Sequence, residues 1–230
     1  MSDKQETEVA VNQTLVTVET TWQKIQKPLI TGVLAVAVIV GGWFAYQTYI
    51  QQPKEAKASE ALFKAEQYFA MDSSSLVLNG DGQYKGVLNV ISNFSGTKAA
   101  NLAHYYAGVS YLKLGDFNNA IKYLKDFSTD AKQIQLLATG CLGDALAETN
   151  KKEDALAAYK KAATSFEKDE ANSSEYLFRA ALLLETMGKS TDALALYQSL
   201  KTKFPKTDKG SQVDKYIYRL SIEKNDFTAE

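Results

Sequence analysis

The sequence predicts an all-α protein in which a single N-terminal transmembrane helix precedes a solenoid of helical hairpins. Three observations predict this class: an uncharged apolar stretch near the N-terminus, a hairpin pattern that returns at intervals in the mid-thirties, and few helix-breaking residues. Only three prolines and thirteen glycines occur in 230 residues, so helices can run largely uninterrupted. A hydrophobic content of 45% and a charged content of 23% are ordinary for a folded domain.

The segment 28–50 is the predicted transmembrane helix. It contains no charged residue, and the 19 positions from Pro28 to Tyr46 are almost wholly apolar. At ~1.5 Å per residue they span about 28 Å, close to the ~30 Å hydrocarbon thickness of a bilayer. Trp22 before the segment and Trp43 near its far end suit the two membrane interfaces. A cleaved signal peptide is the alternative, but 27 residues precede the segment and no small-x-small cleavage site ends it.

The tail 1–27 is predicted to lie in the cytoplasm. Its later part forms either an amphipathic helix on the membrane surface or a solvated segment, because apolar residues recur there at near-helical spacing at Leu15, Val18, Trp22 and Ile25. Lysines flank both sides of the apolar segment, so the positive-inside rule does not decide the orientation. A short tail before a single anchor favours export of the large C-terminal domain.

Small residues fall four apart on one face of the predicted membrane helix, at Ala37, Gly41 and Ala45. This small-xxx-small pattern would let another helix approach closely. Such residues are also common in membrane helices that have no partner.

The stretch 104–127 predicts two short helices folded against each other. Small residues at Gly108 and Ala120 let the two helices approach closely, Gly115 ends the first helix, and Tyr111 fills the space between them. Equivalent positions return in two further copies, which add Gly143, Ala155 and Tyr159, then Gly188, Ala193 and Tyr197.

A period in the mid-thirties with this pattern resembles the tetratricopeptide repeat. The repeats are expected at about 101–131, 136–168 and 174–206. Asn150 replaces the turn glycine of the second copy, and asparagine also tolerates the left-handed conformation.

The rest of the repeat domain, 53–223, is expected to cover the two ends of the stack. A leading hairpin at 54–95 comprises a helix up to residue 71, a loop at 73–83 and a second helix at 84–94. A capping helix follows at 211–221, and 224–230 is a flexible tail. The loop contains Asn-Gly-Asp-Gly around Asp81, but an EF-hand register would put Val77 and Leu88 at the first and last ligand positions. Neither side chain binds calcium, so the loop is interpreted as a turn.

The sequence offers little chemistry, and we expect neither an enzyme nor a cofactor or metal site. His104 is the single histidine and lies at a packing position, and Cys141 is the single cysteine, so zinc has no familiar ligand set. We find no phosphate-binding glycine loop and no Gly-x-Ser-x-Gly elbow. A net charge of -1 argues against a nucleic-acid partner.

In tetratricopeptide repeats the second, fifth, ninth and twelfth positions of each unit point to the concave, partner-binding surface. The resemblance therefore implies a predominantly apolar groove, which we name the predicted groove: Leu102, Tyr105, Val109, Leu112, Asp144, Phe178 and Leu182. Such a groove suits an amphipathic helix or an unfolded segment. The alternative is that it is filled from within, by the helix around Val213 to Leu220. Tyr105 and Val109 replace the lysine and asparagine that clamp chaperone carboxylates in some relatives.

A short tail, one membrane helix, a leading hairpin and a few degenerate repeats together resemble the bacterial YfgM-like family. The resemblance implies an ancillary subunit of the Sec translocon in the inner membrane, with the repeat domain in the periplasm. It also implies binding to a membrane-anchored periplasmic chaperone of the prolyl isomerase type and to emerging unfolded polypeptides. The alternatives are a cytosol-facing membrane docking receptor and a structural protein that assembles with itself.

Overall fold

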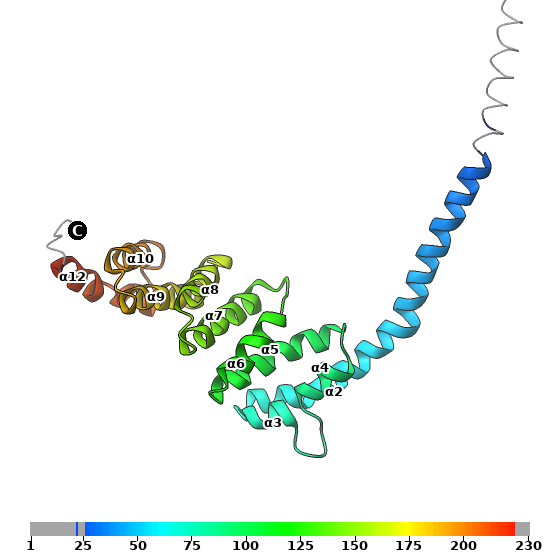
Figure 1. The fold of residues 1–230 in the computed structure, drawn as a ribbon, viewed down its shortest axis with the longest axis horizontal. Helices are drawn as coiled ribbons and strands as arrows, with labels where there is room; N and C mark the ends of the chain where they lie inside the picture. Colours follow the sequence, from blue (N-terminus) through cyan, green and yellow to red (C-terminus); the bar gives the residue numbers. More distant parts are fainter. Residues whose placement is uncertain (1–21, 23–25, 224–230) are drawn as a thin grey trace, which may run out of the picture. The chain divides into compact units, whose positions relative to one another are not determined.

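A computed structural model of the chain describes residue 22 and residues 26–223, and the chain divides into two compact units, Met1–Lys54 and Glu55–Glu230. The described residues form helices throughout, and their only bridge-type pairing joins Gly80 and Lys85 (Figure 1). The all-α class predicted from the sequence is confirmed. Of the expected amphipathic part of the tail, Leu15, Val18 and Ile25 lie outside the described residues, and so does the expected flexible tail 224–230.

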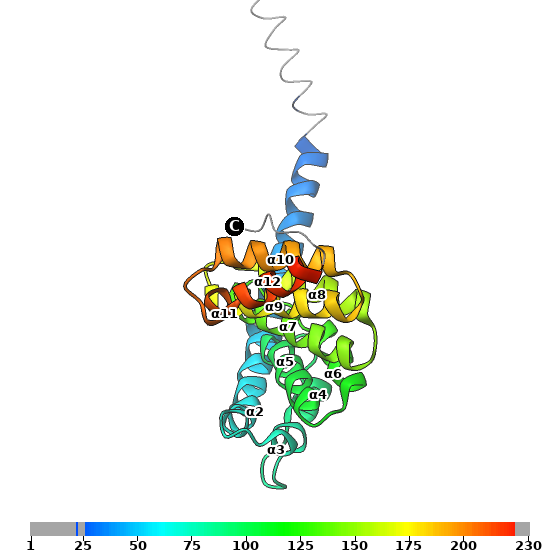
Figure 2. The same cartoon turned by 90° about the vertical axis from the view of Figure 1, so that its left-hand side faces the viewer.

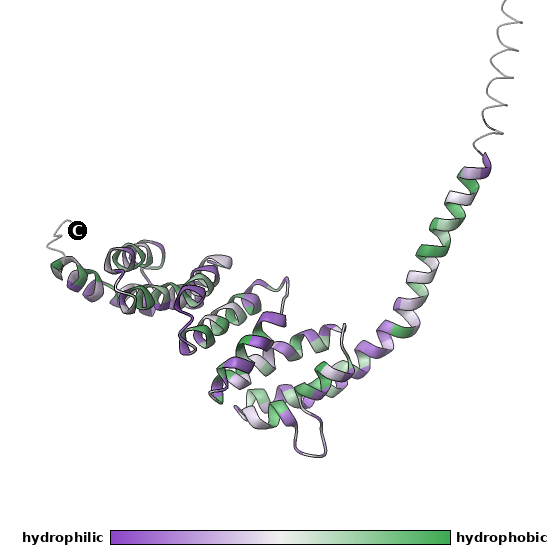
Figure 3. Ribbon diagram, viewed as in Figure 1, coloured by the Kyte–Doolittle hydropathy of each residue, from purple (hydrophilic) through white to green (hydrophobic). Residues whose placement is uncertain are grey.

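The described residues include one helix that is long and apolar enough to cross a membrane, and its apolar part belongs to the N-terminal unit. Helical backbone runs for 45 residues, from Gln26 to Ala70, and its apolar window is not buried inside the protein. Figure 3 shows hydrophobic residues concentrated in the N-terminal part of this helix, and the sequence from 28 to 52 places no charged residue on any face of it. A helix that is hydrophobic on every side and exposed on every side is suited to a lipid environment.

The helix continues through Pro53 instead of ending before it. A π-helical turn, η1 (Gln47–Gln51), precedes α2 (Gln52–Ala70), and the Gln52 N–H donates to the Gln47 carbonyl five residues back. Proline lacks an N–H, and its ring crowds the carbonyl four residues earlier. The wider π turn directly before Pro53 relieves that crowding, so one continuous helix replaces the two helices that the sequence suggested.

The repeat unit opens with α2, α3 (Ser74–Asn79) and α4 (Val87–Asn93), which share one core with α5 (Lys98–Lys113). The expectation of a loop at 73–83 was wrong, because α3 buries Val77 and Leu78 to 0% and 3% exposure. The following helix begins at Val87 and not at 84. Gly86 precedes it, and a Cβ there would lie 2.2 Å from the Leu78 carbonyl oxygen, so only glycine fits between the two short helices.

Three helical hairpins follow in sequence order (Figures 1 and 2). They are α5 with α6 (Phe117–Asp126), α7 (Lys132–Glu148) with α8 (Lys152–Ser165), and α9 (Glu170–Thr186) with α10 (Ser190–Lys203). Their first helices begin at Lys98, Lys132 and Glu170, a few residues before the expected starts at 101, 136 and 174. Side-chain caps explain two of these earlier starts, since Thr97 accepts from the Ala100 N–H and Asp169 from the Asn172 N–H.

The repeated small residues lie at the tight contacts within the hairpins. A Cβ on Gly108 would lie 2.5 Å from Leu124 Cγ, and one on Gly143 would lie 2.6 Å from Tyr159 Cδ1. The turns of the three hairpins use positive φ angles of 78°, 58° and 71° at Gly115, Asn150 and Gly188. The remaining predicted packing residues lie in the core or on its border: Ala120, Ala155, Ala193 and Tyr197 are fully buried, and Tyr111 stacks on Tyr123 at 5.4 Å.

Two helices, α11 (Asp208–Gln212) and α12 (Asp214–Glu223), close the C-terminal end of the stack. The sequence predicted one helix at 211–221. The segment starts earlier because Thr207 caps α11 by accepting from the Gly210 N–H. It breaks near Val213, whose side chain is fully buried together with those of Ile217 and Leu220 in the core of the last repeats. The end of the apolar core is thereby shielded from water.

Candidate partner-binding surface

The first helices of neighbouring repeats lie side by side, and α2 extends this row at its N-terminal end. Glu55 accepts the backbone N–H groups of Lys98 and Ala99 at 2.7 and 2.8 Å, which fixes the start of α2 to the start of α5. Farther along, Tyr106 donates to Glu66 at 3.3 Å, and Lys113 pairs with Asp72 at the ends of both helices. These contacts run in the same order on both helices, so α2 and α5 are parallel.

The N-terminal part of the predicted groove is aromatic. The Tyr105 ring lies 6.3 Å from Phe69 and 5.5 Å from Phe127, measured between ring centroids, and Leu102 and Val109 belong to the same apolar cluster. Burial raises the pKa of Tyr105 to about 12, so its hydroxyl stays neutral at physiological pH. Leu112 packs at the edge of the next cluster. Leu102, Tyr105 and Leu112 remain partly exposed and can contact a partner.

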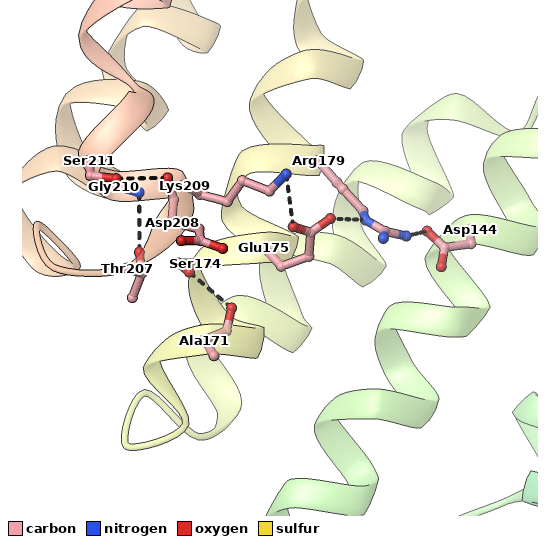
Figure 4. A network of polar contacts seen from close by, with 10 residues as sticks. All are labelled: Asp144, Ala171, Ser174, Glu175, Arg179, Thr207, Asp208, Lys209, Gly210 and Ser211. Carbon is pink, nitrogen blue, oxygen red and sulfur yellow. Dashed lines mark hydrogen bonds and ion pairs between the residues drawn. The ribbon is translucent and has the colours of Figure 1, made fainter. Parts of the chain in front are cut away.

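The middle of the predicted groove carries a chain of charges, which Figure 4 shows. Asp144 accepts from the Tyr159 hydroxyl at 2.8 Å and from the Arg179 guanidinium at 2.5 Å. Arg179 also donates to Glu175 at 2.8 Å, and Glu175 pairs with Lys209 at 3.2 Å. The two acids and two bases alternate from α7 through α9 to α11. Asp144 is therefore an internal cross-link between repeats.

The C-terminal part of the predicted groove is largely filled from within. Phe178 is only 7% exposed, because Tyr216 of α12 meets its ring edge-on at 5.0 Å and Lys209 lies 4.9 Å from the ring centroid. Of the predicted residues in this repeat, Leu182 keeps 36% exposure. The internal filling that the sequence left open as an alternative thus occurs at Phe178, although α11 contributes to it as well as the expected helix.

A second acid, Glu185, repeats the arrangement one hairpin later. It accepts from the Tyr197 hydroxyl at 2.6 Å and from Arg219 of α12. Both arginines in the sequence, Arg179 and Arg219, are therefore used inside the protein to join a repeat to the helix that follows it.

The sequence analysis did not identify Tyr176 of α9, whose ring packs against α7. A Cβ on Gly140 would lie 1.9 Å from Tyr176 Cζ, so the ring occupies the space that a side chain at 140 would need. Tyr176 is 6% exposed, and its ring stacks near Tyr159 with centroids 6.2 Å apart. Gly140, a glycine within the helix α7, was the one available signal of this close approach.

The residues considered for catalysis sit in packing environments. Burial raises the pKa of the Cys141 thiol to about 11, which keeps it protonated. Burial also lowers the pKa of His104, whose ring lies 5.8 Å from Tyr123. Within residues 26–223, no three His, Cys, Asp or Glu side chains come together as a metal site. Asp81 uses its carboxylate to accept from the Tyr68 hydroxyl and from two backbone N–H groups of its own turn.

The small residues Ala37, Gly41 and Ala45 lie in the exposed apolar part of the candidate membrane helix. Apart from the neighbouring backbone of the helix itself, nothing in the described chain lies within 4 Å of a Cβ built on Gly41. Their role in helix packing stays a prediction.

Two stretches match family models of the tetratricopeptide repeat, residues 102–131 and residues 142–207. The matches cover most of the first and second hairpins and the whole of the third. A search of curated proteins found no match. The chain thus carries tetratricopeptide repeats, a class of helical hairpins that generally serves as a scaffold for protein–protein interactions and not as a catalyst.

Proposed function

We propose that this protein is a non-catalytic, membrane-anchored scaffold of the Sec export channel, with its repeat domain in the periplasm. The repeats would bind a membrane-anchored chaperone of the prolyl isomerase type and emerging unfolded polypeptides. Support comes from three sources: the repeats themselves, the apolar helix that precedes them, and the resemblance of the whole arrangement to the YfgM-like family. The inner membrane of a bacterium is the proposed location, with the N-terminus in the cytoplasm.

The observation that carries this proposal is the short connection between the apolar segment and the repeats. Glu55 already bonds to the N-terminus of α5, yet it follows Ile50, the end of the predicted membrane segment, by only five residues. Five residues span at most about 18 Å even when fully extended. A domain tethered this closely meets partners at the membrane surface, where an export channel releases its substrates.

The chemistry of the partly exposed surface supports polypeptide capture. Leu102, Tyr105 and Leu112 offer apolar and aromatic contacts without a free charge among them. Unfolded segments and amphipathic helices expose the apolar side chains that such a surface can shield from water.

Protease protection tests the orientation. Cells, spheroplasts and lysed membranes that contain the full chain would be treated with protease, and the C-terminal domain followed by an antibody. Digestion in spheroplasts is expected. Protection until lysis would place the repeats in the cytoplasm and would replace this proposal by the cytosol-facing docking receptor.

Site-specific crosslinking tests the partner class. A photo-reactive residue would replace Tyr105 in the full chain, with the exposed Lys160 of α8 as the matched control position. We expect adducts with Sec subunits, the chaperone or an arrested export substrate from position 105 but not from position 160. Equal adduct patterns from both positions, or adducts with none of these partners, would reject the proposal.

A further inference from the structure

A pocket of about 360 Å³ opens between α9 and α11, beside the filled end of the predicted groove. Ala171, Ser174 and Glu175 line it from α9, and Asp208, Lys209 and Gln212 line it from α11. Figure 4 shows these two walls, with the Asp208 carboxylate near Ser174 and the Lys209 side chain reaching across to Glu175.

The charges of the pocket do not cancel. Lys209 pairs with Glu175 at 3.2 Å, and Glu175 also accepts from Arg179. The charges of Lys209 and Glu175 are therefore already compensated. The backbone carbonyl of Asp208 accepts from Ser211, but its carboxylate has no hydrogen bond or ion pair among the contacts of residues 26–223. One negative charge at the pocket is therefore available to a cation.

The size and the walls of the pocket favour a single long side chain. Its volume lies near the lower end of the ~300–1,000 Å³ typical of ligand pockets, far below the space that a helix needs. Ser174, which is 1% exposed, lines the pocket together with Ala171 and Lys209, and the lining contains both polar and apolar atoms. The Gln212 amide adds a carbonyl acceptor. An alkyl stem ending in a cationic donor group matches both features.

We propose that this pocket binds one basic side chain of a polypeptide partner, with Asp208 as its counter-ion. An arginine is expected to bind better than a lysine, because a guanidinium can donate two parallel hydrogen bonds to one carboxylate. The inference rests on the proposed function only in that a polypeptide supplies the side chain. The pocket would add a binding point for a cation at the third repeat, in addition to the apolar contacts of Leu102, Tyr105 and Leu112.

Nuclear magnetic resonance titration of the full chain in nanodiscs tests the site directly. The probe is Nα-acetyl-arginine amide, and the uncharged isostere Nα-acetyl-citrulline amide is the comparison. We expect saturable shifts of the Ser174, Lys209 and Gln212 backbone signals with the arginine probe at millimolar concentration. The citrulline probe is expected to bind about three- to ten-fold more weakly, as the loss of one partly solvated ion pair implies.

Three variants test whether binding of the arginine probe depends on Asp208 and on the space in the pocket. Asp208→Asn should weaken binding of the arginine probe by the same three- to ten-fold, and Ala171→Phe should abolish binding by filling the pocket. Asp192→Asn removes a comparable exposed acid from the first turn of α10 and should leave binding unchanged. Equal binding of both probes, or unchanged binding by Asp208→Asn, would overturn the proposal. Because the probe contains no partner protein, this failure would leave the export-channel proposal to its own tests.

Discussion

The two halves of the repeat unit connect their first helices in different ways. Between α2 and α5 an aromatic cluster lies among the polar contacts of Glu55, Glu66 and Asp72, with the Phe69 ring 4.7 Å from Tyr106 and 6.3 Å from Tyr105 between ring centroids. From α7 to α12 the corresponding space holds two carboxylates, Asp144 and Glu185, each bonded to a tyrosine and an arginine. Hydrogen-bonded charges require defined geometry, whereas apolar surfaces can repack against different ligands. The N-terminal half is therefore the better candidate for variable partners.

The difference between the two halves can be tested most directly by placing glutamate at the same repeat position in each half, at 178 and at 105. Phe178→Glu should cost about 3–5 kcal/mol, because it removes a buried ring and places a carboxylate under Tyr216. Tyr105→Glu should cost about 1–2 kcal/mol, since the more exposed site can solvate the charge, and it should weaken partner capture. Urea unfolding of the full chain, followed by circular dichroism, measures both costs. Equal costs would show that the two halves do not differ in internal filling.

A smaller loss is expected from Gly140→Ala. The added Cβ would lie 1.9 Å from Tyr176 Cζ, so the buried ring must shift. Overpacking of this kind costs about 1–3 kcal/mol, which exceeds the ~1 kcal/mol that alanine contributes through helix propensity. In a Tyr176→Leu background the clash is absent, and the same substitution should become stabilising. Thermal unfolding of the four proteins of this double-mutant cycle shows whether Gly140→Ala raises or lowers stability in each background. Destabilisation in both backgrounds would contradict the proposed clash.

The charged cross-links of the C-terminal half should differ from each other in strength. Arg179→Ala removes the bond to Asp144 and the bond to Glu175, and we expect a loss of about 1 kcal/mol because its side chain is 38% exposed and partly screened. Arg219→Ala breaks one pair at 50% exposure and should cost no more than about 0.5 kcal/mol. Urea unfolding at low and high salt provides the measurement. A larger loss for Arg219→Ala would reverse the assigned order.

The sequence allowed the fold class and the repeat positions to be predicted because both depend on local patterns. Gly108 and Gly143 indicate close approach of two helices, and Asn150 indicates a left-handed turn. Both features are properties of single backbone positions. The short helix α3 escaped prediction because six residues give too little periodicity, and its Val77 and Leu78 are defined by burial against other helices. The π turn before Pro53 escaped for a similar reason, since it depends on how the chain accommodates a proline.

The candidate site was less accessible to sequence reasoning, because the charged pairs that join neighbouring repeats are 34 or 35 positions apart in the sequence. Arg179 reaches Asp144 at a separation of 35, and Arg219 reaches Glu185 at 34. The repeat register indicates that such residues lie on neighbouring helices, but it does not indicate whether they pair with each other or with a ligand. The burial of Phe178 beneath Tyr216 likewise depends on the exact path of α11 and α12.

The smallest expected effect is a pH dependence of the folding stability that comes from the Glu175 carboxyl group. Burial alone would raise the pKa of this carboxyl group, but hydrogen bonds and charges from Arg179 and Lys209 outweigh it and hold the pKa below its ordinary value. A lowered folded-state pKa contributes stability above the unfolded value of about 4.3, and this contribution disappears as the pH falls through the folded value.

The stability advantage of the wild type over Glu175→Gln should therefore be largest near pH 7 and should shrink below about pH 5. Glu170→Gln, which removes one exposed acid from the same helix, is the matched control for the change in net charge. A constant difference between wild type and Glu175→Gln from pH 7 to pH 3.5 would mean that the charge chain across α7, α9 and α11 adds no pH-dependent stability, and the contrast between the two halves would then rest on packing alone.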